Sequence, residues 1–104
     1  MTRIFWVSKH ELLNSQRNLL YNLFSSVEVI EIKGFMPSVQ WLLKNYIIPL
    51  KPDIIITTLP LSIIKQLLDL STQYGFEVWI PKMKTVKDSN EPIMEYDHDW
   101  EIVN

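Results

Sequence analysis

The chain of 104 residues contains no cysteine. A disulfide scaffold, a thiolate zinc site and a cysteine nucleophile are therefore excluded. Glycine is nearly as scarce, since Gly34 and Gly75 are the only two in the sequence. A glycine-rich dinucleotide-binding fingerprint and a Walker loop both need several glycines at close spacing, so neither is present.

An excess of positive charge is also lacking, because the formal net charge is −2. We therefore expect neither duplex DNA nor a membrane as a partner. An anionic ligand would have to be bound by positive groups gathered at one site. Apolar stretches end well before membrane-spanning length, and MTRIFWVSKH lacks the long apolar core of a signal peptide. With 47% hydrophobic residues, the composition predicts a single globular cytoplasmic domain over residues 1–104.

Four segments have the apolar patterns of β-strands. Arg3 to Ser8 and Asp53 to Thr58 are largely apolar throughout, as expected for strands buried on both faces. Val27 to Lys33 alternates apolar and acidic residues, which favours an edge strand. Phe76 to Met83 is the fourth, and Pro81 within it indicates an edge or a bulge.

Three helices are expected between these strands. Apolar residues at helical spacing run from Leu12 to Phe24 and from Val39 to Ile47, and Pro37 suits a first helical turn. The third helix is predicted to begin near Pro60 and to end at Gly75.

This alternation predicts an α/β, Rossmann-like fold, with a parallel sheet of about four strands and helices on both faces. The two most apolar strands belong in the centre and the acidic second strand outside, which gives the order 2-1-3-4. The polar C-terminal extension, residues 84–104, is expected to form either a short hairpin or an arm across a partner.

In that order the chain leaves strands one and three in opposite directions, which opens a crevice at their carboxyl ends. The crevice brings Ser8-Lys9-His10 beside Thr57-Thr58-Leu59-Pro60. The first of these segments enters a helix whose N-terminus offers N–H groups and a positive dipole to a phosphate. Lys9 adds charge, and His10 adds a donor that titrates near neutral pH. The same residues also fit a helix cap, a solvated lysine and an exposed histidine.

Polar residues on the helices extend this candidate site. Thr57, Thr58 and Ser62 are candidates to cradle a phosphate at the third helix, although Thr58 also fits an ordinary N-cap. Gln16 lies on the apolar stripe of the first helix and is a candidate contact to an adenine edge.

The C-terminal extension contains metal-ligand residue types but no second cluster. Glu95-Tyr96-Asp97-His98-Asp99 is local and acidic, so we interpret it as a solvated arm and assign no metal. Trp6 and Trp79 are expected in the core, whereas Trp100 is a candidate cover for a partner or a pocket.

Two stretches, FWVSKHELLNSQ and TTLPLS, resemble the small single-domain ring nucleases of CRISPR systems, which are relatives of the CARF (CRISPR-associated Rossmann fold) domain. In some of these proteins the first strand ends in Ser, a basic residue and His, and a later strand ends in Gly-Thr-Leu-Pro. Others carry His, then Leu-Thr, then Gln at the first helix, where this chain has His10 to Gln16. Thr57 replaces the glycine and Leu13 the threonine, and the last twenty residues are not covered.

The resemblance implies a homodimer that binds a cyclic oligoadenylate, with cyclic tetra-adenylate as the favoured ring. It also implies metal-independent cleavage of that ring, in which a ribose 2′-OH attacks the adjacent phosphate. Because the ring is the antiviral signal of type III CRISPR systems, its cleavage would switch the signal off. Neither metal nor cofactor is required. Ser8, Lys9 and His10 would contact phosphate, and His10 or Lys9 would stabilise charge or protonate the leaving oxygen.

Two other functions fit the same residues. One is a binding module of this fold that senses or sequesters the messenger without cutting it. A small α/β protein-interaction module would use its hydroxyl residues as helix caps alone. A sequence-specific DNA binder is disfavoured, because the chain has no basic recognition helix.

Overall fold

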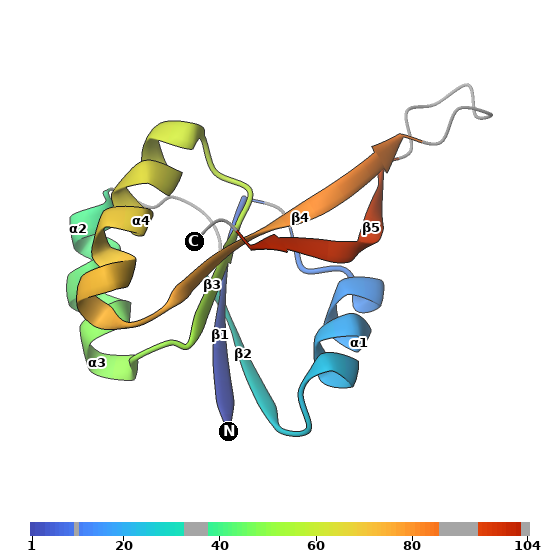
Figure 1. The fold of residues 1–104 in the computed structure, drawn as a ribbon, viewed down its shortest axis with the longest axis horizontal. Coiled ribbons are helices and arrows are strands. Elements are labelled where there is room, and N and C mark those ends of the chain that lie inside the picture. Colours follow the sequence, from blue (N-terminus) through green and yellow to red (C-terminus); the bar gives the residue numbers. More distant parts are fainter. Residues whose placement is uncertain (10, 33–37, 86–93, 103–104) are drawn as a thin grey trace.

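The computed structural model describes residues 1–9, 11–32, 38–85 and 94–102. A five-stranded sheet in the order β2-β1-β3-β4-β5 forms its centre, with helices on both faces (Figure 1). The strands are β1 (Thr2–Val7), β2 (Val27–Ile32), β3 (Ile54–Thr57), β4 (Glu77–Thr85) and β5 (Met94–Ile102). The helices are α1 (Asn14–Leu23), α2 (Val39–Leu42), η1 (Leu43–Ile47), α3 (Ile48–Leu50) and α4 (Leu61–Tyr74).

The strands β2, β1, β3 and β4 run parallel, and their order confirms the predicted 2-1-3-4. Burial explains this order. Residues 4–7 of β1 and all of β3 are buried, so these two strands occupy the centre. Most residues of β2 are half-buried, and an edge position leaves its glutamates in contact with water.

The C-terminal extension, predicted as a short hairpin or an arm, contributes the strand β5, which forms an antiparallel pair with β4. In this pair Trp79 lies opposite Ile102. The sheet therefore has a fifth strand that the sequence did not predict, and β4 is not an edge strand. The register shifts between Pro81 and Met83, which is the bulge that the proline indicated.

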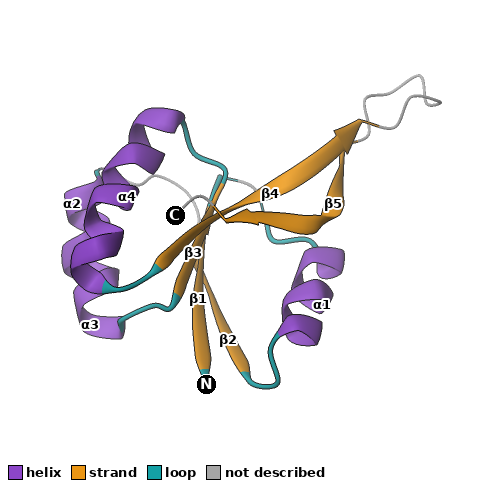
Figure 2. Ribbon diagram, viewed as in Figure 1, coloured by secondary structure: helices purple, strands orange, loops and turns teal. Residues whose placement is uncertain are grey.

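Two hydrophobic cores lie on opposite faces of the sheet, because successive strand residues point to opposite sides. α1 covers one face, and α2, α3 and α4 cover the other (Figure 2). Trp6 packs with Leu20 and Trp79 on the α1 side, so both tryptophans lie in the core as predicted. Phe5 packs with Leu67 on the other side. The prediction of helices on both faces is therefore confirmed.

The second predicted helix is longer than expected and irregular. α2, η1 and α3 follow one another from Val39 to Leu50, and η1 is a π-helical turn. Pro49 explains the irregularity, because proline has no N–H and clashes with the carbonyl four residues earlier. A wider π turn relieves that clash. Pro37 lies outside the described residues, and the side chain of Ser38 caps α2 by accepting from the N–H of Trp41 at 3.1 Å.

α4 is a regular helix of 14 residues. It follows Pro60 and ends at Gly75, whose φ of 72° is the left-handed conformation that glycine adopts at little cost. Both predicted ends of this helix are confirmed. Over the described ranges, no helix combines the length and the apolar character needed to cross a membrane.

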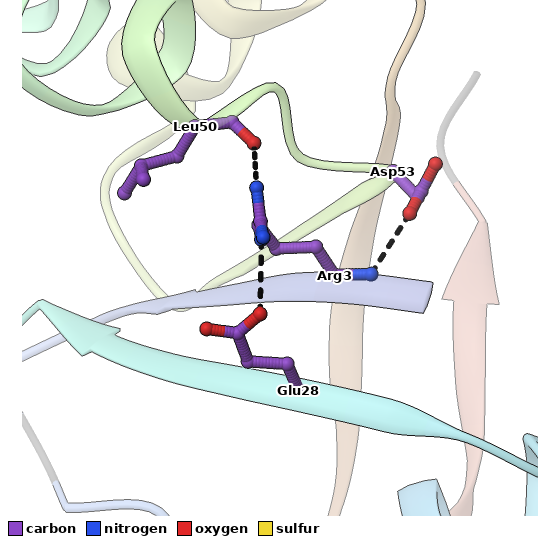
Figure 3. A network of polar contacts seen from close by, with 4 residues as sticks. All are labelled: Arg3, Glu28, Leu50 and Asp53. Atoms are coloured by element: carbon purple, nitrogen blue, oxygen red, sulfur yellow. Dashed lines mark hydrogen bonds and ion pairs between the residues drawn. The ribbon is translucent and has the colours of Figure 1, made fainter. Parts of the chain in front are cut away.

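Arg3 joins three elements near the start of β1 (Figure 3). Its Nε donates to Glu28 Oε2 at 3.1 Å, its Nη1 donates to the carbonyl of Leu50, and its backbone N–H donates to Asp53 Oδ2 at 2.8 Å. The backbone N–H of Asp53 donates in return to the carbonyl of Arg3 at 2.8 Å. These bonds fix β1 against β2 and against the turn that enters β3.

Candidate anion-binding site at the carboxyl edge of the sheet

Ser8 and Thr58 meet at the carboxyl edge of the sheet. Val7 and Thr57 are in register at the ends of β1 and β3, so the next residue of each strand follows at the same edge. Ser8 Oγ and Thr58 Oγ1 lie 2.6 Å apart and share a hydrogen bond. The two segments that the topology was expected to bring together are therefore in direct contact.

An open hollow of about 220 Å³ lies beside this contact, and Lys9, Thr58, Leu59 and Pro60 line it. Lys9 is exposed, so its ammonium group is available to an anion in the hollow. The lining thus comes from both segments, one after β1 and the other after β3. This is the place where a parallel α/β sheet of this order usually binds ligands.

The N-terminus of α4 adds backbone donors next to the hollow. The carbonyl of Pro60 accepts from the N–H groups of Ile63 and Ile64, at 2.9 and 3.2 Å. No side chain caps the helix. Among the residues that the structure describes, the N–H groups of Leu61 and Ser62 have no acceptor. Two unpaired donors at the positive end of a long helix are suited to bind a phosphate.

The two threonines have different roles from those that the sequence favoured. Thr57 is fully buried, and its Oγ1 accepts from the N–H of Leu59 at 3.1 Å. In this conformation Thr57 shapes the turn and does not reach the hollow. Thr58 was also predicted as a possible N-cap, and that prediction is wrong, because the cap position is Pro60 and the hydroxyl of Thr58 is bonded to Ser8.

The two N–H groups that precede α1 donate to acceptors from the chain itself. Glu31 Oε1 accepts from the N–H of Leu12 at 3.4 Å, and Gln16 Oε1 accepts from the N–H of Leu13 at 2.9 Å. The other oxygen of Glu31 is paired with Arg17 Nη2 at 3.1 Å. These two N–H groups are therefore not available to a phosphate, but both precede the first helical residue, Asn14, so the expectation for the helix itself stays a prediction.

Gln16 is fully buried. Its Nε2 has no hydrogen-bond partner among the described residues, although its Oε1 is used at the start of α1. A direct contact between Gln16 and an adenine edge would require the first turn of α1 to move. In this conformation the residue has a structural role.

The remaining predicted site residues divide by exposure. Ser62 is exposed at the start of α4, where a ligand can reach it. Ser8 is only 2% exposed, so it supports Thr58 from beneath the hollow. His10 lies outside the described residues, as do the side chains of Glu95 to Asp99. Within the described part of the chain, no group of three or more His, Asp or Glu residues is arranged to hold a metal ion.

Sequence reasoning missed two features of this edge. The first is the position of the free N–H groups at Leu61 and Ser62: N–H donors to a phosphate were expected at this boundary, and the absence of a side-chain acceptor at Leu59 and Pro60 was a visible signal of which ones are free. The second is Glu31. Because Glu28 and Glu31 are three positions apart in a strand, they face opposite sides, so the spacing indicated that only one of them lies on the α1 side, and the bonds to Leu12 and Arg17 show that it is Glu31.

Comparisons with known proteins find no relative: no family model, no curated protein and no solved structure matches the chain.

Proposed function

We propose that this protein is a ring nuclease with a CARF-like, Rossmann-like fold. It would bind a cyclic oligoadenylate, with cyclic tetra-adenylate as the favoured ring, and open that ring to switch off type III CRISPR signalling. The observation that carries the proposal is the hydrogen bond of 2.6 Å between Ser8 and Thr58. It joins the two segments that resemble the family and sets them beneath one hollow.

The chemistry of the hollow favours an anionic ligand. Lys9 contributes a formal charge, and the N–H groups of Leu61 and Ser62 contribute the positive end of α4. Because the chain as a whole carries a net charge of −2, this attraction is local. Such an arrangement suits one phosphate group better than an extended nucleic-acid backbone.

The size of the hollow supports a homodimer. Its volume of about 220 Å³ is below the range of about 300–1,000 Å³ that is typical of ligand sites. A ring of four nucleotides is larger than this hollow, so the hollow of one protein chain would hold only one part of the ring. Two copies related by a two-fold axis would present the same residues twice to a symmetric ring.

In the proposed reaction a ribose 2′-oxygen attacks the adjacent phosphorus. The new P–O2′ bond forms as the P–O5′ bond breaks, the 2′-hydroxyl loses its proton, and the leaving 5′-oxygen gains one. The products end in a 2′,3′-cyclic phosphate and a 5′-hydroxyl. Holding the ribose and the phosphate in line supplies several kcal/mol of the acceleration, and donors at the developing charge supply more.

Lys9 and the N–H groups of Leu61 and Ser62 would stabilise the negative charge that develops on the phosphoryl oxygens. His10 stays the predicted donor to the 5′-oxygen. If it has that role, His10→Ala lowers the cleavage rate much more than it lowers the affinity for the ring. An equal loss in both would assign His10 to binding alone.

A protein that sequesters the messenger without cutting it is the second candidate. The observation that favours it is the burial of hydroxyl groups at the site, because Ser8 is 2% exposed and Thr57 is fully buried. Neither side chain reaches a ligand in this conformation. Cleavage would then depend on the ring's own 2′-hydroxyl groups and on how the site orients them.

Incubation with labelled cyclic tetra-adenylate in the presence of EDTA tests the proposal. We expect linear products, and we expect Lys9→Ala to slow their formation by about tenfold, which is about 1.4 kcal/mol of transition-state stabilisation. Lys44→Ala is the matched control, because Lys44 is an exposed lysine on η1. Tight binding of an intact ring would identify the sequestering protein. No binding at all would contradict both candidates and favour an interaction module.

A further inference from the structure

The lining of the hollow has two chemical halves. Lys9 and Thr58 give it a charged and polar side, whereas Leu59 and Pro60 give it an apolar side. Leu61, the next residue, is 66% exposed. Three consecutive residues, Leu59 to Leu61, therefore present apolar surface directly beside the phosphate-binding groups. An inorganic anion would use the polar side and leave this surface in water, where it gains nothing.

The hollow also has more room than one phosphate group needs. A volume of about 220 Å³ is many times the space of about 10–15 Å³ that holds one water molecule. The remaining space borders Leu59 and Pro60. A ligand that fills it must carry a flat or bulky apolar group close to its phosphate, and a nucleotide has such a group in its base.

We infer that Leu59, Pro60 and Leu61 form a nucleobase subsite and that Leu61 determines the preference for a base-bearing ligand. This inference rests on the proposed function, because it takes the phosphate to lie at Lys9, Thr58 and the start of α4. The base covers Leu61 and removes its side chain from water. The preference is for a nucleotide over a sugar phosphate of the same charge.

The alternative explanation for the exposed side chain of Leu61 is that a second copy of the chain covers it. Its association would not depend on a phosphate, and it would be weakened by truncation of Leu61. The base subsite makes the opposite predictions, because Leu61 then matters for a ligand that carries a base and not for the oligomeric state. Sedimentation of the wild type and of Leu61→Ala without ligand separates the two.

The test measures the binding of ribose 5′-phosphate and of adenosine 5′-monophosphate to the full chain. We expect the nucleotide to bind more tightly than the sugar phosphate. Leu61→Ala should weaken nucleotide binding by about tenfold, which is about 1.4 kcal/mol, and leave ribose 5′-phosphate unchanged. Leu61→Met, which keeps a large apolar side chain, should retain the preference. Leu23→Ala is the matched control, since Leu23 is 56% exposed at the far end of α1.

Each contrary outcome has a separate meaning. If both compounds bind equally and Leu61→Ala changes neither affinity, the base subsite is overturned and the anion site remains. If Leu61→Ala changes the oligomeric state and the affinity for both compounds together, Leu61 belongs to an interface between copies, which also overturns the inference. If neither compound nor cyclic tetra-adenylate binds the wild type, the proposed function itself has failed.

Discussion

Ser8 and Thr58 share a hydrogen bond of 2.6 Å across fifty positions of sequence. The bond joins the ends of two neighbouring parallel strands, β1 and β3, which are followed by helices on opposite faces of the sheet. It holds the loop that carries Lys9 against the loop that leads into α4. The candidate site depends on this relationship, because the two halves of its lining come from these two loops.

Removal of this bond should destabilise the protein and uncouple the loops. Thr58→Val keeps the shape of the side chain and leaves the buried Ser8 with one bond fewer, so we expect a loss of about 1 kcal/mol in the free energy of unfolding. A double-mutant cycle with Ser8→Ala, measured by urea denaturation, should give a coupling energy of about 0.5–1.5 kcal/mol. A coupling near zero would show that the two hydroxyls do not support each other.

The unpaired N–H groups of α4 can be tested by a proline substitution. Leu61→Pro removes one donor, and proline is well tolerated at the first position of a helix. The extended ψ of 154° at Pro60 is also compatible with a following proline. We therefore expect normal stability but weaker binding of inorganic phosphate, measured by calorimetry.

Leu61→Ala is the control for that experiment, because it truncates the same side chain and keeps the N–H group. It should bind inorganic phosphate as the wild type does. If Leu61→Pro and Leu61→Ala bind phosphate equally, the start of α4 is not where the anion lies.

Glu31 should act as a positioning residue for the loop that carries Lys9. Its carboxylate accepts from the N–H of Leu12 and pairs with Arg17 at 3.1 Å. Glu31→Gln removes a negative charge near the site, and by charge alone this change should tighten the binding of an anion. If the carboxylate of Glu31 holds the Lys9 loop in place, the same variant should bind the ring more weakly. The sign of the change in affinity decides between the two.

The Arg3 cluster offers a test of stability that leaves the site intact. Arg3→Ala removes the contacts to Glu28 and to the carbonyl of Leu50 near the opposite end of β1. The side chains of Arg3 and Glu28 are 34% and 39% exposed, so solvent screens the pair and we expect a loss of only about 1 kcal/mol. Thermal melting in low and high salt should show a smaller difference in high salt. A large loss of ligand affinity would contradict the assignment of this cluster to structure.

The strand order could be predicted because burial follows directly from the apolar patterns. A strand such as β3, which is largely apolar and buried along its whole length, favours a position between two neighbours. The alternating β2 tolerates an edge because its glutamates remain partly in water. These two patterns were sufficient to predict the parallel sheet and the meeting of Ser8 with Thr58.

Other features depend on contacts between distant residues, and the sequence alone did not reveal them. The π-helical turn of η1 arises from the steric demand of Pro49 in the helix turn that follows it. Gln16 lies on the apolar stripe, yet its burial at the start of α1 followed only from the structure. Thr58 was expected to cap α4 because threonine often does so, but its hydroxyl is bonded to Ser8 instead.

The most direct measurement is a titration of the isotope-labelled protein with cyclic tetra-adenylate, followed by the amide signals in NMR spectra. We predict that the amides of Leu61 and Ser62 shift the most and saturate together, and that Lys9→Ala weakens this response. If the ring binds while these two amides keep their positions, the phosphate lies elsewhere and the proposed site is wrong.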